Sequence, residues 1–86
     1  MSIMQTMVRN PSGLHARPAA QLSAFCKKYP NDIRLTCGDR TCNPKSMFSL
    51  LGGCFKAGDT VTVSVENDDT GSTAQQIVSF IAGLEE

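Results

Sequence analysis

The chain contains one histidine, His15, and the residue types beside it suit the chemistry of phosphoryl groups. Pro11, Ser12 and Gly13 favour a turn and Pro18 suits the first turn of a helix, so His15 is predicted at or beside a helix N-terminus. Backbone N–H groups there, such as those of Ala16 and Arg17, have no acceptor within the helix and favour an anion. The Arg17 guanidinium also suits phosphate oxygens. Because both features disfavour imidazolium, we expect a nucleophilic imidazole that is transiently phosphorylated.

The residues around His15 also match the signature of a known family. The run Gly13-Leu14-His15-Ala16-Arg17-Pro18-Ala19-Ala20 resembles, without a gap, the active-site motif of HPr, the histidine-containing phosphocarrier of the bacterial phosphoenolpyruvate:sugar phosphotransferase system. The resemblance extends from end to end of the chain. It implies that Nδ1 of His15 accepts a phosphoryl group from Enzyme I and passes it to a sugar-specific IIA protein or domain. Arg17 would pair with the phosphoryl oxygens. The alternative for His15 is a histidine that only caps the helix and is not phosphorylated.

The resemblance further implies how partners dock. The helix that begins at Ala16 and a short helix after Ser46 would contact both donor and acceptor. An apolar centre would be formed by Ala20, Met47, Phe48 and Leu51, and a basic rim by Lys27 and Lys45. Ser46 stands where many relatives carry a serine that an ATP-dependent kinase phosphorylates, and a helix-capping role explains the same residue.

Two positions depart from the family pattern. Ser49 stands where relatives often carry lysine, and Cys54 where glycine is usual. These changes suit a specialised member, and the alternative function is a regulatory HPr-like paralogue that docks on partners according to its phosphorylation state. A stand-alone enzyme is disfavoured, since no carboxylate partner, metal set or nucleotide loop accompanies His15.

Composition limits the remaining functions. The 86 residues predict one domain, residues 1–86, without a cofactor domain, and we expect no bound cofactor. A net charge of +0 with 19% charged residues disfavours general binding to nucleic acid or to an anionic membrane. We expect a cytoplasmic protein without membrane insertion, because residues 1–8 lack the pattern of a secretion signal and no apolar run could cross a bilayer.

The cysteines are predicted to be structural. Cys26, Cys37, Cys42 and Cys54 form no Cys-x-x-Cys pair, so buried, inert thiols are favoured over disulfides or a metal site. Cys37 and Cys42 flank a predicted hairpin turn and could face each other, which makes them the pair most open to oxidation.

Alternating strands and helices are predicted to position the loop around His15. Hydrophobic periodicity and turn residues indicate strands over 2–8, 33–37, 40–43 and 60–65, and helices over 16–29, over 47–52 and after 68–71. Lys27 and Lys28 are expected in the last turn of the first helix. In the second helix, Leu50 and Leu51 are expected to reach the core while Met47 and Phe48 stay outside.

The order β-α-β-β-α-β-α predicts an α+β fold, and the element pattern alone also permits a ferredoxin-like arrangement. The resemblance to HPr implies an open-faced β-sandwich, with a four-stranded antiparallel sheet in the order 1-4-2-3 and three helices on one face.

Overall fold

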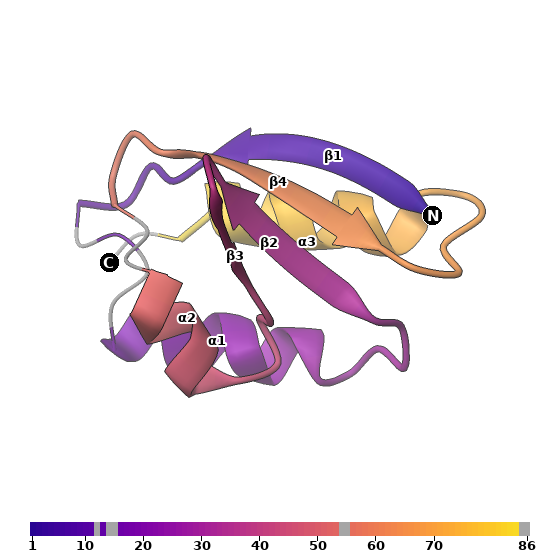
Figure 1. The fold of residues 1–86 in the computed structure, drawn as a ribbon, viewed down its shortest axis with the longest axis horizontal. Coiled ribbons are helices and arrows are strands. Elements are labelled where there is room, and N and C mark those ends of the chain that lie inside the picture. The colour runs from indigo at the N-terminus through magenta and orange to yellow at the C-terminus, as the bar shows by residue number, and fades with distance from the viewer. Residues whose placement is uncertain (12, 14–15, 54–55, 85–86) are drawn as a thin grey trace.

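The computed structural model describes residues 1–11, 13, 16–53 and 56–84, and in this part of the chain one sheet carries three helices on one face (Figure 1). The element order is the predicted one. The strands are β1 (Ser2–Met7), β2 (Ile33–Cys37), β3 (Arg40–Cys42) and β4 (Thr60–Val65), and the helices are α1 (Ala16–Cys26), α2 (Met47–Gly53) and α3 (Ser72–Ala82).

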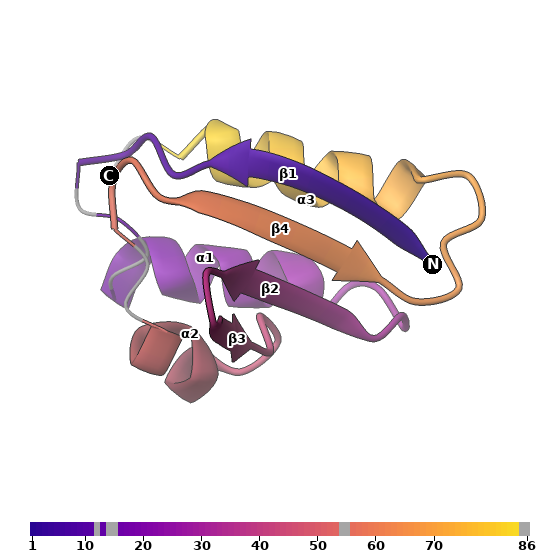
Figure 2. The ribbon, with the colours of Figure 1, turned by 45° about the horizontal axis from the view of Figure 1, so that its top comes forward.

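The sheet is antiparallel throughout and has the order β1-β4-β2-β3. Figure 2 shows β4 between β1 and β2. Val61, Val63 and Val65 of β4 are buried, and the alternate positions are threonines and a serine that are exposed or half-buried. The strand order confirms the HPr-like sheet and rules out the ferredoxin-like alternative.

The core lies between the sheet and the helices. Residues at helical spacing on α1 and α3 are buried, as predicted, and α2 adds one leucine; together they are Ala19, Leu22, Cys26, Leu50, Ala74, Ile77, Val78 and Ile81. These side chains form one cluster with the valines of β4 and with Leu35 of β2. Each large apolar side chain that is fully buried contributes about 1.5–3 kcal/mol.

The first turn of α3 is capped by a carboxylate, as the run 68–71 predicts. Asp68 is buried, and its Oδ2 and Oδ1 accept the N–H groups of Ala74 at 3.0 Å and Thr73 at 3.2 Å. These bonds stabilise the ionised carboxylate and lower the pKa of Asp68 below its ordinary value. Gly71 precedes the helix with φ of 76°, a left-handed conformation that favours glycine.

The buried face of β1, which the sequence left undecided, is now assigned. Met4 and Thr6 are half-buried on the side of α3, whereas Ile3 and Met7 are 61% and 48% exposed on the open side of the sheet. The strand ends one residue earlier than predicted, and Val8 beyond it is fully buried.

The first helix is shorter than predicted. It ends at Cys26 instead of Tyr29, so Lys27 and Lys28 follow the helix and do not belong to its last turn. The N–H groups of Lys28 and Tyr29 bond to carbonyls three residues back, which tightens the chain into turns before Pro30. Tyr29, although outside the helix, still packs against Phe25 in a T-shaped arrangement of the two rings.

Two side-chain predictions are wrong. Leu51 is 40% exposed and is not a core residue, because the seven-residue helix α2 turns Leu50 inward and the next position outward. Cys37 and Cys42 do not face each other, since the two-residue turn sets Cys37 opposite Arg40 and Cys42 opposite Leu35. The thiols of Cys26, Cys37 and Cys42 are free.

Candidate functional site

The loop between β1 and α1 is held by the sheet on its N-terminal side. The N–H of Val8 donates to the carbonyl of Asp59 at 2.9 Å, and the N–H of Gly58 donates to the carbonyl of Val8 at 2.7 Å. These bonds tie the start of the loop to the turn that precedes β4. His15, the predicted phosphorylation site, lies outside the described residues, as do Ser12 and Leu14; Gly13 and Ala16 on either side are described.

A buried asparagine organises the turn before the histidine. Asn10 is 1% exposed, and its Nδ2 donates to the carbonyl of Gly13 at 2.6 Å. The N–H of Gly13 donates in return to the carbonyl of Asn10 at 3.1 Å, and Gly13 has φ of 63°, where glycine is favoured. No role was predicted for Asn10 from the sequence. An asparagine three residues before a glycine in that turn is the signal that could have revealed it.

The helix N-terminus lies where the sequence predicts it. Helix α1 begins at Ala16, the residue directly after His15, and Pro18 is buried in its first turn. Arg17 is exposed. The first N–H groups of a helix have no acceptor within it, so this end of α1 carries a partial positive charge beside an exposed cation. Such an arrangement favours an anionic group at the residue before the helix.

Exposed apolar side chains gather on two neighbouring helices. On α2, Phe48 is 92% exposed, and Met47 and Leu51 are 39% and 40% exposed. Ala20 is exposed on α1, and the two helices pack against each other (Figures 1 and 2). We call Ala20, Met47, Phe48 and Leu51 the apolar patch. At 92% exposure, Phe48 contributes nothing to the core.

The two lysines predicted for the basic rim have different surroundings. Lys27 is exposed just after α1. Lys45 is half-buried, and its Nζ donates to the carbonyls of Tyr29 at 2.7 Å and Asn31 at 2.6 Å. The ammonium of Lys45 therefore stabilises the turn that follows α1, a structural function that the sequence did not indicate.

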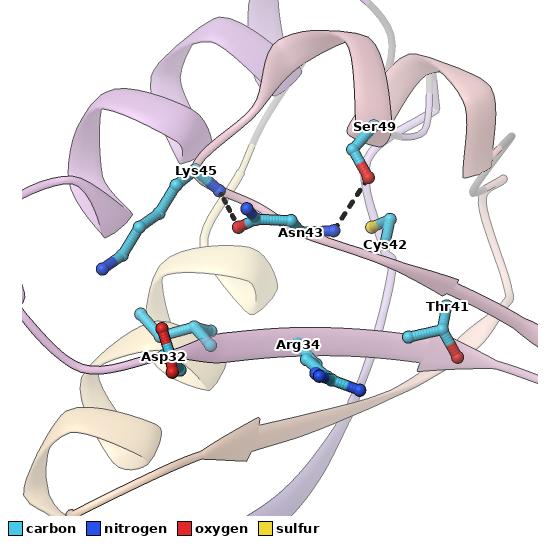
Figure 3. Close-up of a pocket in the computed structure, with 8 residues that line it drawn as sticks. Asp32, Arg34, Thr41, Cys42, Asn43, Lys45 and Ser49 are labelled. Carbon is cyan, nitrogen blue, oxygen red and sulfur yellow. Dashed lines mark hydrogen bonds between the residues drawn. The ribbon is translucent and has the colours of Figure 1, made fainter.

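The approach to α2 is ordered by side-chain caps. Figure 3 shows Asn43 accepting the N–H of Lys45 through Oδ1 at 3.0 Å and donating its own N–H to Ser49 Oγ at 2.8 Å. Ser46 Oγ accepts the N–H of Ser49 at 3.3 Å, which confirms the predicted cap. Asn43, Lys45 and Ser49 also border a hollow of about 400 Å³ between α2 and the β2–β3 hairpin, whose full lining is Asp32, Ile33, Arg34, Thr41, Cys42, Asn43, Lys45 and Ser49. Ser49 therefore joins α2 to the end of β3.

Two of the thiols are suited to packing and not to reaction. Burial raises the pKa of Cys26 to about 12 and the pKa of Cys42 to about 11, although a hydrogen bond with Ser49 opposes the second shift. Cys54 lies outside the described residues. Within the described part of the chain, no three histidine, cysteine or acidic side chains are grouped to hold a metal ion. None of the helices described there has the length and apolar composition that crossing a bilayer requires.

Comparisons with known proteins agree with this geometry. The family model described as "PTS HPr component phosphorylation site" matches residues 4–83. The chain is similar to the phosphocarrier protein HPr of Haemophilus influenzae, with 32% identity over 74 residues that cover 86% of this chain and 87% of that protein. The HPr of Lysinibacillus sphaericus is 30% identical over 84 residues, or 98% of this chain and 96% of the relative.

Solved structures show the same fold. The crystal structure of HPr-C-His from Thermoanaerobacter tengcongensis has a TM-score of 0.84 and 26% identity, and the match covers 100% of each chain. The family match spans the loop, the helix start and the apolar patch described above. The chain belongs to the HPr family, the phosphocarrier proteins of the phosphotransferase system.

Proposed function

We propose that this protein is a cytoplasmic phosphocarrier whose His15 accepts a phosphoryl group at Nδ1 from phospho-Enzyme I and passes it to a IIA protein or domain. The observation that supports this most directly is the start of α1 at Ala16, one residue after His15. A phosphoryl group on that histidine would meet the N–H groups of Ala16 and Arg17 and the guanidinium of Arg17.

The arrangement suits a carrier because phosphoryl transfer needs positioning and charge stabilisation more than covalent chemistry from the protein. A carrier must also release the group, so stabilisation of the phosphorylated form should be moderate. Arg17 is exposed on the first turn of a surface helix, where solvent weakens its electrostatic contribution. Such a site would stabilise the phosphoryl group only moderately, so that the group can be passed on.

Docking of both partners is assigned to the apolar patch on α1 and α2, with Lys27 on its basic rim. Phe48 is the central candidate because it is almost fully exposed and aromatic side chains dominate binding energy at protein interfaces. Lys45 would add positive charge while its ammonium stays bound to the turn after α1. The hydrogen bond from the Ser49 N–H to Ser46 Oγ is by itself enough to explain a serine at position 46. Regulation by a serine kinase stays a prediction from the family resemblance.

Incubation with Enzyme I, magnesium and labelled phosphoenolpyruvate tests the proposal. The native chain should take up one acid-labile, base-stable label, as expected for phosphohistidine. His15→Ala should take up none, and Ser46→Ala, the matched control for serine phosphorylation, should be labelled like the native chain. An unlabelled native chain, or label that persists in His15→Ala, would refute the assignment of His15.

A further inference from the structure

We propose that Asn10 is a positioning residue for phosphoryl transfer, because its buried amide fixes the turn through which the chain enters His15 and α1. The inference rests on the proposed function and adds to it a residue outside the predicted phosphate-binding set. Asn10 acts here through the backbone of Gly13, and no contact with the phosphoryl group is required.

Two reciprocal bonds close the turn at Asn10 and Gly13. The side-chain Nδ2 donates to the Gly13 carbonyl at 2.6 Å, and the Gly13 N–H donates to the Asn10 carbonyl at 3.1 Å. Gly13 precedes His15 by two positions and Ala16, the first residue of α1, by three. Over so short a segment, a rotation of the Gly13 peptide changes the path of the next residues. Displacements of about 1 Å can slow a reaction by about a hundredfold.

The other side of Asn10 is fixed to the sheet. Val8, two residues earlier, is fully buried, and its N–H and carbonyl both bond to the turn before β4, at Asp59 and Gly58. Asn10 itself is 1% exposed. The bond from its side chain to Gly13 therefore links a rigid part of the fold to the loop that carries the histidine.

The Asn10 side chain is buried at both of its polar atoms. Its Oδ1 is buried and has no hydrogen-bond partner in the described part of the chain.

Asn10→Leu tests this role because it removes the amide donor and keeps a side chain of similar size. We expect a modestly lower urea midpoint than that of the native chain, since the hydrogen bond to Gly13 is lost. Amide exchange of Gly13 should accelerate by about tenfold or more, because its turn opens more often. The kcat of transfer from Enzyme I should fall by about ten- to a hundredfold while KM changes little, since the apolar patch is untouched.

Asn31→Leu is the matched control. Asn31 Nδ2 also donates to backbone carbonyls, those of Glu66 at 2.8 Å and Asn67 at 3.2 Å, but at the opposite end of the sheet. Its removal should leave transfer unchanged.

Asn10→Asp provides a second test of the hydrogen bond from Asn10 to Gly13, because an ionised carboxylate cannot donate to the Gly13 carbonyl. Its transfer rate, divided by the native rate, should rise as the pH falls and the carboxylate regains a proton.

Three results would overturn the inference. They are unchanged Gly13 exchange in Asn10→Leu, unchanged kcat in that variant, or an equal loss of kcat in Asn10→Leu and Asn31→Leu. Failure of the proposed function looks different, because the native chain would then take up no label from Enzyme I. A native chain that is labelled normally, with an Asn10→Leu variant that transfers equally fast, would refute the role of Asn10 alone.

Discussion

At the scale of single residues, Arg17 is the side chain that would contact the phosphoryl group directly. It is exposed on the first turn of α1, so its truncation should leave the core intact. Arg17→Ala is predicted to slow transfer both into and out of the chain by about tenfold or more, because a charged donor to the phosphoryl oxygens is lost. The free energy of unfolding should change by less than about 0.5 kcal/mol.

Stopped-flow or quench measurements of transfer in both directions would test Arg17, with urea unfolding for stability. Arg34→Ala is the matched control, since Arg34 is an exposed arginine on β2 and away from the loop. Equal transfer rates for Arg17→Ala and the native chain would contradict the assigned role.

At the scale of elements, α2 presents two apolar side chains with opposite functions. Phe48 is 92% exposed and Leu50 is fully buried. Phe48→Ala should raise the KM for Enzyme I by about tenfold, which corresponds to about 1.4 kcal/mol of binding energy, without lowering stability.

Leu50→Ala should lower the free energy of unfolding by about 2–5 kcal/mol, since it leaves a cavity.

Steady-state kinetics with the chain as substrate and urea unfolding would measure both variants of α2. Loss of stability in Phe48→Ala would show that Phe48 belongs to the core. An unchanged KM in that variant would instead remove the apolar patch from the docking surface.

The elements with strict periodicity were predictable from sequence. β4 alternates valine with threonine or serine over 60–65, and α3 repeats its apolar residues at helical spacing; both lie where they were predicted. The end of α1 was harder to predict from the sequence, because Lys27 and Lys28 suit a helix C-terminus. Only the backbone hydrogen bonds to carbonyls three residues earlier show that the helix has ended. Leu51 was misassigned because a short helix offers too few turns to define its buried stripe.

At the scale of the whole molecule, the unpredicted features depend on contacts between distant segments. Lys45 binds carbonyls 14 and 16 positions earlier in the chain, and no local pattern indicates such bonds. Val8, two residues before the buried Asn10, likewise bonds to Gly58 and Asp59, about fifty positions later in the chain. The motif around His15 could be read from sequence because its residues are contiguous. The residues that support it could not.

The stability of the fold should depend on pH at both extremes. Asp68 has a lowered pKa, so its stabilisation is present above the unfolded value of 3.8 and is lost as the pH falls below it. Cys26 has a raised pKa, so its contribution is present below the unfolded value of 9.0 and is lost as the pH rises toward 12. Cys42 acts in the same direction between 9.0 and about 11.

Urea unfolding across this pH range would test both limbs. Asp68→Asn should reduce the loss of stability on the acid side, and Cys26→Ala the loss on the alkaline side. A variant whose pH profile runs parallel to the native profile over its own limb would contradict the corresponding assignment.

Delivery of the phosphoryl group is the measurement that tests the carrier function most directly. The labelled chain, purified away from Enzyme I and phosphoenolpyruvate, is mixed with a IIA protein, and the label on each protein is followed with time. The carrier function predicts that label leaves His15 and appears on the IIA protein in equal amount, faster than it is lost to water. Label that stays on the chain, or is released only as inorganic phosphate, with each IIA protein of the host would contradict it and favour a regulatory paralogue.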